Sequence, residues 1–434
     1  MTTLPTYAET LQHLYGRAGA GMKLGLDTMR ELLGLLGNPQ HRCGPCVVVA
    51  GTNGKGSTTS CIADALRRSG HKVGLYTSPH LLRFAERIRI NGVEIADPTV
   101  IEAYALIRSV EEHCSRPPTF FECTTAIALY AFAEAQIDVS VLEVGLGGRL
   151  DATNVVDKHL AVISPIGLDH TDVLGDTLAQ IAAEKAAIIG ANRPVVVAPQ
   201  APEALRVIRN VAQDRNATLY LLDIKHVLDT NNVSDTQNDP PRLPTLLASY
   251  QRLNLRVAAK ACQVLHETGI SCPPEHIRAA QENFLWPGRF HWIDEHILLD
   301  AAHNLAGLEV LLEALKHDPR TKSSSVPNSN RPIHGVFTAL RDKPAESLLK
   351  RLTPVLKQLH LCPVKVSRSR TVAELRALAQ PGMQVHADCI PALAAARQAA
   401  EKDGGLVLVT GSIFLVAEAL GHLTGAKTDP PVAL

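Results

Sequence analysis

A glycine-rich loop with a lysine and two hydroxyl groups is the part of this sequence best suited to chemistry. It runs Ala50-Gly51-Thr52-Asn53-Gly54-Lys55-Gly56-Ser57, and Thr58 follows it. Such a loop presents backbone N–H groups and a helix N-terminus to an anion, and its lysine reaches the outer phosphates of a nucleotide. The Ser57 hydroxyl is suited to Mg²⁺. The loop therefore predicts a nucleotide triphosphate site, with a glycine-rich turn that binds nothing as the alternative.

The spacing of this loop departs from the Walker A pattern, which has four residues between its glycines and ends in G-K-[ST]. Here Gly51 and Gly54 are closer together, and Gly56 separates Lys55 from Ser57. The loop lies between residues 46–50, a short β-branched run, and residues 57–69, which contain no Gly or Pro. These flanks predict a buried strand and a helix, which favours a phosphate site over a bare turn.

Other polar residues follow or end further predicted strands. Ser78 comes soon after one strand, Glu143 lies in the apolar strand 139–144, and His170 follows the strand 160–164. Ligands of open α/β sheets bind outside the carboxyl ends of the strands, so we expect these groups to converge on the nucleotide. A carboxylate in this position is suited to Mg²⁺. The alternatives are a solvated glutamate and a hydrogen-bonded structural histidine.

Two further groups have more than one possible role. Arg149 and Asp151 could contact a substrate or pair with each other at the surface. The run Asp300-Ala301-Ala302-His303-Asn304 lies at a predicted strand end and helix start. It is a candidate second wall for the nucleotide, because ligand sites favour domain interfaces. Asn304 is equally suited to act as an ordinary helix cap.

Strands and helices alternate along the chain, which predicts parallel α/β sheets covered by helices on both faces. Helices are expected at residues 97–113, 122–136, 177–189 and 249–268, and an exposed loop at 229–244. Residues 286–289 form a plausible domain junction. Beyond it, strands are expected at residues 297–300, 333–337, 360–362 and 406–410. We therefore expect an ATP-binding and catalytic domain over residues 1–287 and a smaller, Rossmann-like α/β domain over 288–434.

Composition narrows the functional class. The 434 residues are 46% apolar and 20% charged, which is typical of a globular protein with a large core. The 43 basic and 43 acidic residues balance, which argues against general nucleic-acid binding. No signal peptide or membrane-spanning run is visible, so we expect no membrane partner. The nine scattered cysteines suit a reducing cytoplasm.

One cysteine pair has the spacing of a redox dithiol, Cys43-Gly44-Pro45-Cys46. Redox chemistry needs the first cysteine at a helix N-terminus, where its pKa falls. Here the pair runs directly into a strand, so we expect no redox function.

The motifs together resemble those of a known family, the folylpolyglutamate synthases/dihydrofolate synthases of the Mur ligase superfamily. They occur in family order and span nearly the whole chain. The matching stretches are AGTNGKGS (50–57), TSPHL (77–81), ERIRING (86–92), FFE (120–122), EVGLGGRLDATN (143–154), IGLDHTDVLG (166–175), EKAAI (184–188), PGRF (287–290), DAAHN (300–304) and GS (411–412).

The resemblance implies ATP-dependent amide-bond formation with Mg²⁺. A substrate carboxylate takes the γ-phosphoryl group of ATP, and the amine of L-glutamate then attacks the acyl phosphate. The substrates implied are dihydropteroate and reduced folyl-glutamates, and we expect a monomer. Such chemistry depends on positioning and on stabilising charge at the transferring group.

The resemblance also assigns residues. Lys55, His170 and Lys185 are expected in catalysis, and Lys185 matches a lysine that the family carbamylates. The implied metal ligands are Ser57, Ser78, Glu143 and His170. The implied nucleotide-binding residues are Gly51 to Thr58, Asn254, Arg289, Asp300 and His303. The pterin-binding positions are Phe121, Asp151 and Ala152.

Three residues depart from the family pattern, and none removes an expected ligand. Ala187 stands where the family usually has glycine, Leu305 replaces a common proline, and Pro165 just before IGLDH is unusual. The pattern around residues 338–343 resembles bacterial bifunctional members. A single-activity folylpolyglutamate synthase is the alternative, followed by another Mur-type amide ligase and a non-catalytic nucleotide-binding module.

Overall fold

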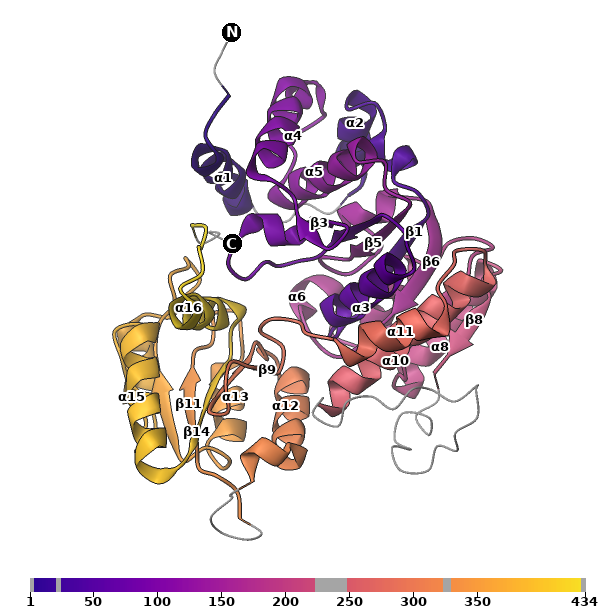
Figure 1. Ribbon diagram of the computed structural model, residues 1–434. Coiled ribbons are helices and arrows are strands. Elements are labelled where there is room, and N and C mark those ends of the chain that lie inside the picture. The colour runs from indigo at the N-terminus through magenta and orange to yellow at the C-terminus, as the bar shows by residue number, and fades with distance from the viewer. Residues whose placement is uncertain (1–3, 21–24, 223–247, 323–328, 431–434) are drawn as a thin grey trace. The chain divides into compact units, whose positions relative to one another are not determined.

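The computed structural model describes residues 4–20, 25–222, 248–322 and 329–430, and these form two compact units (Figure 1). The first unit comprises residues 1–80, 84–245 and 251–284. The second comprises residues 81–83, 246–250 and 285–434. The predicted loop at 229–244 lies outside the described residues.

The sheet of the first unit has eight strands in the order β4-β3-β2-β5-β1-β6-β7-β8. The six from β2 to β8 in this order are parallel, whereas β3 and β4 are antiparallel and form one edge. Their bounds are β1 Cys46–Ala50, β2 Val73–Tyr76, β3 Ile88–Ile90, β4 Val93–Glu94, β5 Val139–Glu143, β6 Lys158–Ile163, β7 Val195–Val197 and β8 Leu219–Leu221.

Helices cover both faces of this sheet. Helices α3 (Lys55–Arg68) and α5 (Phe120–Glu134) lie on opposite faces of the sheet, as Figure 1 shows. Helix α11 (Pro274–Glu282) packs on α3, and α8 (Pro202–Asp214) packs on α7 (Leu178–Ala186). The other α-helices among the described residues of this unit are α1 Tyr7–Gly16, α2 Asp27–Leu35, α4 Asp97–Val110, α6 Thr171–Leu174 and α10 Ser249–Glu267.

The second unit has a six-stranded sheet in the order β13-β12-β11-β14-β10-β9, in which β9 alone among these strands is antiparallel. Buried apolar residues form a core on each side of it. The strands are β9 His291–Trp292, β10 Ile297–Asp300, β11 Ile333–Phe337, β12 Gln358–Leu361, β13 Gln384–Val385 and β14 Leu406–Thr410. The helices are α12 Leu305–His317, α13 Ala345–Leu352, α14 Val372–Leu378, α15 Cys389–Asp403 and α16 Ile413–Thr424.

The parallel α/β architecture expected from the alternation is therefore confirmed. Strand β1 coincides with the predicted run 46–50, and β10, β11 and β14 coincide with theirs. The antiparallel edge strands were not predicted, because β3, β4 and β9 have only two or three residues each.

Candidate active site

The phosphate loop lies at the carboxyl end of the central strand β1, and its glycines are required by close contacts. A Cβ on Gly51 would lie 1.9 Å from the Ser164 hydroxyl oxygen. A Cβ on Gly54 would lie 2.2 Å from the Asn254 side-chain oxygen. Both glycines also have positive φ angles, of 152° and 85°. The structure thus brings Asn254, from α10, directly against the loop.

The loop is tied to the segment that follows β6. The backbone N–H groups of Thr52 and Asn53 donate to the Pro165 carbonyl at 3.0 and 3.3 Å. The Thr52 hydroxyl donates to the Gly167 carbonyl at 3.0 Å. The carbonyl of the unusual Pro165 is therefore an acceptor for the loop. This role does not need the backbone N–H group that proline lacks.

The predicted lysine sits at the first position of α3, where Gly54 is the N-cap residue. Lys55 Nζ donates to the carbonyls of Gly51 and Thr52 at 3.1 and 3.2 Å. Ser57 and Thr58 lie buried in the first turn of the same helix. The ammonium group is thus held over the loop whose N–H groups are expected to receive phosphate.

Two of the expected metal ligands lie together. Glu143, at the end of β5, is 4% exposed and its Oε2 accepts from the Ser78 backbone N–H at 3.1 Å. The carboxylate and the Ser78 segment therefore meet at the carboxyl ends of neighbouring strands β5 and β2. This placement agrees with a ligand role, because a buried carboxylate needs compensating positive charge or donors.

His170 differs in its surroundings. It is exposed and adopts the left-handed conformation, with φ at 49°, as the N-cap residue of α6. Its backbone N–H donates to Asp169 Oδ1 at 3.0 Å.

Lys185 is the most perturbed cation of the expected site. It lies in the last turn of α7 and is 4% exposed. Its pKa is lowered to about 7, mainly by burial and also by the nearby Lys55, whereas Asp169 and Asp151 oppose the change. At neutral pH a large share of this side chain is therefore an uncharged amine, the form that can react with CO₂.

The GLGG stretch after β5 packs directly against the lysine helix. A Cβ on Gly148 would lie 2.7 Å from the Glu184 carbonyl and 3.2 Å from the Lys185 Cα. Arg149 Nε pairs with Glu184 Oε1 at 2.8 Å. Arg149 and Asp151 therefore do not pair with each other, which corrects one of the two roles considered for them.

The expected pterin-binding residues also converge. The Phe121 ring packs closely on Gly145, since a Cβ added to Gly145 would lie 2.3 Å from the Phe121 Cζ atom. Asp151 is buried, accepts from Leu146 N at 2.9 Å and from the Thr153 hydroxyl at 2.6 Å, and precedes the buried Ala152. Burial raises the pKa of Asp151, opposed by these hydrogen bonds. Asp151 thus fixes the loop that faces Phe121.

The expected residues of the second unit form a group of their own. Asp300 ends β10, is 4% exposed, and accepts from the Tyr250 hydroxyl at 2.6 Å and Phe290 N at 2.8 Å. Arg289 and the Nδ1 atom of His303 both contact the Ala301 carbonyl, at 3.2 and 2.9 Å. Burial raises the pKa of Asp300, and Arg289 opposes this.

Asn304 does act as the N-cap of α12, since its side chain accepts from Gly307 N at 2.7 Å. The cysteine pair is buried, and burial raises the pKa of Cys43 to about 12 and of Cys46 to about 11. Neither thiol is therefore a thiolate near neutral pH, which agrees with the absence of redox chemistry expected from the sequence.

Magnesium fits this donor set. Within the described ranges, no three His, Cys, Asp or Glu side chains are grouped to hold a metal ion. Mg²⁺ seldom needs such a cage, because it keeps water and takes phosphate oxygens beside one or two carboxylates. Glu143 supplies such a carboxylate.

Comparisons with known proteins identify the family of this chain. Residues 49–241 match the Mur ligase middle domain, and residues 288–413 match the Mur ligase, glutamate ligase domain. The chain is 32% identical to the dihydrofolate synthase/folylpolyglutamate synthase of Bacillus subtilis over 433 residues, covering 95% of this chain and 98% of the relative. The chain belongs to the dihydrofolate synthase/folylpolyglutamate synthase family.

Solved structures of this family have the same fold. Escherichia coli FolC in complex with DHPP and ADP superimposes with a TM-score of 0.81 and 31% identity, covering 97% of this chain and 99% of that one. The bifunctional enzyme of Yersinia pestis complexed with AMPPNP and Mn ion gives a TM-score of 0.81 and 30% identity, covering 96% and 98%.

The buried side chain of Arg87, near the expected site, was not predicted from the sequence. Arg87 is 2% exposed, its Nε donates to His80 Nδ1 at 2.8 Å, and its guanidinium lies 5.2 Å from the Phe120 ring centre. Burial lowers the pKa of both Arg87 and His80. The ERIRING motif contains Arg87, but only the fold shows what the side chain contacts.

Proposed function

We propose that this chain is an ATP-dependent ligase that adds L-glutamate to dihydropteroate and to reduced folyl-glutamates. The observation that carries the proposal is similarity over nearly the full length of both chains to enzymes named for these two activities. One relative is solved in complex with DHPP and ADP, and ADP is the nucleotide product of the proposed reaction. The phosphate loop with Lys55 supplies the matching chemistry in this chain.

The reaction has two balanced steps. A carboxylate oxygen of the pterin substrate attacks the γ-phosphorus of ATP, and the bond from that phosphorus to the ADP oxygen breaks. The glutamate nitrogen then attacks the acyl carbon, the amine loses a proton, and inorganic phosphate leaves. Both steps require reacting atoms to be held in line while charge is stabilised.

The first unit supplies the groups for phosphoryl transfer. The N–H groups of the phosphate loop and Lys55 would hold the phosphates, and Phe121, Asp151 and Ala152 would orient the pterin. Mg²⁺ held by Ser57, Ser78, Glu143 and His170 would neutralise phosphate charge.

Lys185 has the properties of a carbamylation site. Its pKa of about 7 leaves a neutral amine to attack CO₂, which would convert a buried cation into a carboxylate-like group. We propose that this group adds negative charge beside the metal ions. In the second unit, Arg289, Asp300 and His303 would contact the nucleotide.

The proposal extends to the setting of the enzyme. Among the described residues, no helix has the length and apolar character needed to cross a membrane. All nine cysteines are free, which supports a reducing compartment such as the cytoplasm. We propose a monomer, which light scattering of the purified chain would test.

A phosphate-release assay tests the activity. We expect release that requires ATP, L-glutamate and either dihydropteroate or a reduced folyl-glutamate, and none when glutamate is left out. Turnover with only the folyl-glutamate would make the chain a single-activity folylpolyglutamate synthase. Turnover with neither pterin would refute the proposal.

A further inference from the structure

The first turn of α5 is anchored by three consecutive side chains that contact three different parts of the first unit. Phe120 packs edge-on against Tyr15 of α1, with ring centres 5.9 Å apart. Phe121 packs against Tyr76 of β2, with ring centres 6.1 Å apart. Glu122 forms an ion pair with Arg116. The turn that carries an expected pterin-binding residue is therefore held by a charged pair as well as by rings.

The ion pair between Arg116 and Glu122 is bidentate and sheltered from solvent. Arg116 Nη1 and Nη2 each donate to a different Glu122 oxygen at 2.9 Å. The Glu122 side chain is 5% exposed and that of Arg116 is 21% exposed. Two parallel hydrogen bonds between planar groups fix orientation as well as distance.

Glu122 also closes the start of the helix. It occupies the N3 position of a capping box, in which its Oε2 accepts from Thr119 N at 2.8 Å. The Thr119 hydroxyl accepts in return from Glu122 N at 3.3 Å. The carboxylate thus receives three hydrogen bonds from the protein, which leaves it little capacity to bind a ligand itself.

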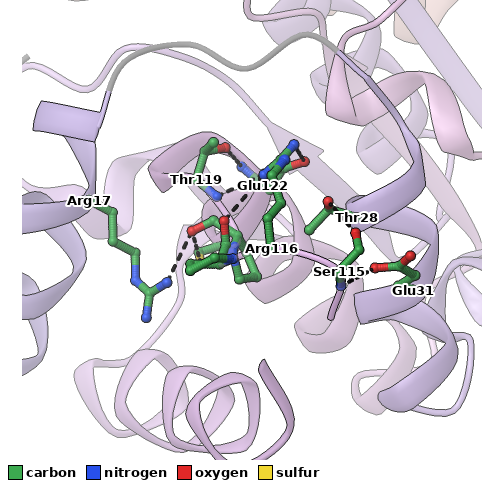
Figure 2. A network of polar contacts seen from close by, with 10 residues as sticks. Arg17, Thr28, Glu31, Ser115, Arg116, Thr119 and Glu122 are labelled. Atoms are coloured by element: carbon green, nitrogen blue, oxygen red, sulfur yellow. Dashed lines mark hydrogen bonds and ion pairs between the residues drawn. The ribbon is translucent and has the colours of Figure 1, made fainter. Parts of the chain in front are cut away.

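The segment before α5 is fixed from two further helical elements, as Figure 2 shows. Arg17 Nη1 donates to the Pro118 carbonyl at 3.0 Å, and its Nε donates to the Tyr104 hydroxyl at 2.8 Å. Glu31 of α2 accepts from Ser115 N at 2.7 Å. Arg116 therefore joins Glu122 to a segment that is itself held in place.

Contacts run from this pair to the expected pterin site. Glu122 is adjacent to Phe121, whose ring fills the space beside Gly145. Gly145 opens the loop in which Asp151 accepts from Leu146 N. A shift in the first turn of α5 would therefore move the Phe121 ring relative to the loop that carries Asp151.

We infer that Arg116 and Glu122 are positioning residues for the pterin substrate, and that they act through the Phe121 ring. This inference rests on the proposed function, because it takes Phe121 to be a pterin contact. Misplacing a substrate by about 1 Å can cost as much as 10²-fold in rate, so a buried pair beside the contact has leverage.

Steady-state kinetics of Glu122→Gln tests the inference. Glutamine keeps the capping box but loses the charge that Arg116 pairs with. We expect the KM for dihydropteroate to rise roughly 10-fold or more, while the KM for ATP stays unchanged. The matched control is Glu374→Gln, which makes the same change in the exposed capping box of α14.

A double-mutant cycle with Phe121→Ala separates positioning from a general structural effect. If the pair acts through the ring, Glu122→Gln adds no further rise in pterin KM to the Phe121→Ala variant. If the two effects multiply, the inference is wrong. An unchanged pterin KM in Glu122→Gln, or an equal rise in the KM for ATP, also overturns it.

Failure of the proposed function and failure of the inference give different experimental results. If wild-type protein turns over no pterin, the proposed function fails, whereas turnover with a normal pterin KM in the variant overturns the inference alone. If Glu122→Gln does not fold, Arg116→Lys replaces it, because lysine keeps the charge but loses the bidentate geometry. A pterin KM unaltered in Arg116→Lys would then overturn the inference.

Discussion

Each unit of this protein contains a helix that starts with the same device, a Thr-x-x-Glu capping box whose glutamate pairs with an arginine on both oxygens. In the first unit Glu122 pairs with Arg116 and its side chain is 5% exposed. In the second, Glu374 pairs with Arg341 at 3.0 and 2.9 Å, and the two side chains are 40% and 44% exposed. Both pairings are bidentate, but Arg116 donates through Nη1 and Nη2 whereas Arg341 donates through Nε and Nη2. The second pair is much more exposed to solvent.

This difference indicates that burial, rather than the sequence motif, determines how much a charged pair contributes to local structure. Water screens the exposed pair, so its removal should change little. Water does not screen the buried pair in this way, and that pair lies beside Phe121. Two lysines with lowered pKa values extend the comparison. Lys185 is buried in a helix packed against the GLGG loop, whereas Lys158 is only half-buried, at the start of β6.

The largest effect is expected at the phosphate loop. Lys55→Ala should lower turnover by roughly 10²-fold or more, as when a preorganised charge contact is lost. The control is Lys316→Ala on α12, whose side chain is 65% exposed and paired with Glu313. The phosphate-release rate measures both variants. Near-normal turnover in Lys55→Ala would refute its assigned role.

Lys185 and Lys158, the two lysines with lowered pKa values, give the next prediction. Lys185→Ala should impair turnover, with partial rescue by small carboxylates if the lysine is carbamylated. Lys158 is the control because burial also lowers its pKa, to about 8, yet it donates only to the Asn154 carbonyl among its described hydrogen bonds. Lys158→Ala should retain turnover and show no rescue.

The carbamate itself can be observed directly. A crystal structure of the wild-type protein should show density beyond the Lys185 amine, since the group is too labile for routine mass measurement. A bare amine at high CO₂ would contradict carbamylation.

The two capping boxes should differ in local stability. Glu122→Gln should lower the free energy of opening at the start of α5 by about 1–3 kcal/mol, because buried hydrogen bonds to a charged group are lost. Glu374→Gln should leave α14 nearly unchanged. Hydrogen exchange followed by mass spectrometry reports each helix separately, and equal losses of protection would refute the contrast.

The smallest effect is expected in the stability of the second unit, and only below neutral pH. His360 is 1% exposed, its Nδ1 lies 3.0 Å from His386 Nε2, and burial lowers its pKa to about 4. The unfolded chain binds a proton near the ordinary pKa of 6.5, so stability falls as the pH drops from 6.5 towards 4.

His360→Gln removes this contribution. Its melting temperature should depend less steeply on pH over that window, by about one proton in the linkage slope. The two proteins should show the same slope above pH 7. A slope identical to wild type between pH 6.5 and 4 would contradict the assignment.

The sequence predicted those parts of the fold and site that depend on local patterns. The strand 46–50, the loop glycines and the helix after them follow from residue type and spacing, and the structure places them as expected. The contact of Asn254 with Gly54 joins residues 200 positions apart, so only the resemblance to relatives suggested it.

Other features could not be predicted because they depend on tertiary packing. The capping-box motif alone does not distinguish the buried Glu122 from the exposed Glu374, since both stand three residues after a threonine. The same holds for Arg87, whose burial against His80 and Phe120 depends on contacts between segments that are apart in the sequence.

The central claim is that this chain joins glutamate to a pterin carboxylate at the expense of ATP. The most direct test is to incubate the protein with ATP, Mg²⁺, L-glutamate and dihydropteroate and to analyse the products by mass spectrometry. We expect a product heavier by one glutamate residue, with ADP and phosphate formed in equal amounts. If ATP is consumed without such a product, or if neither dihydropteroate nor a reduced folyl-glutamate is extended, the claim is wrong.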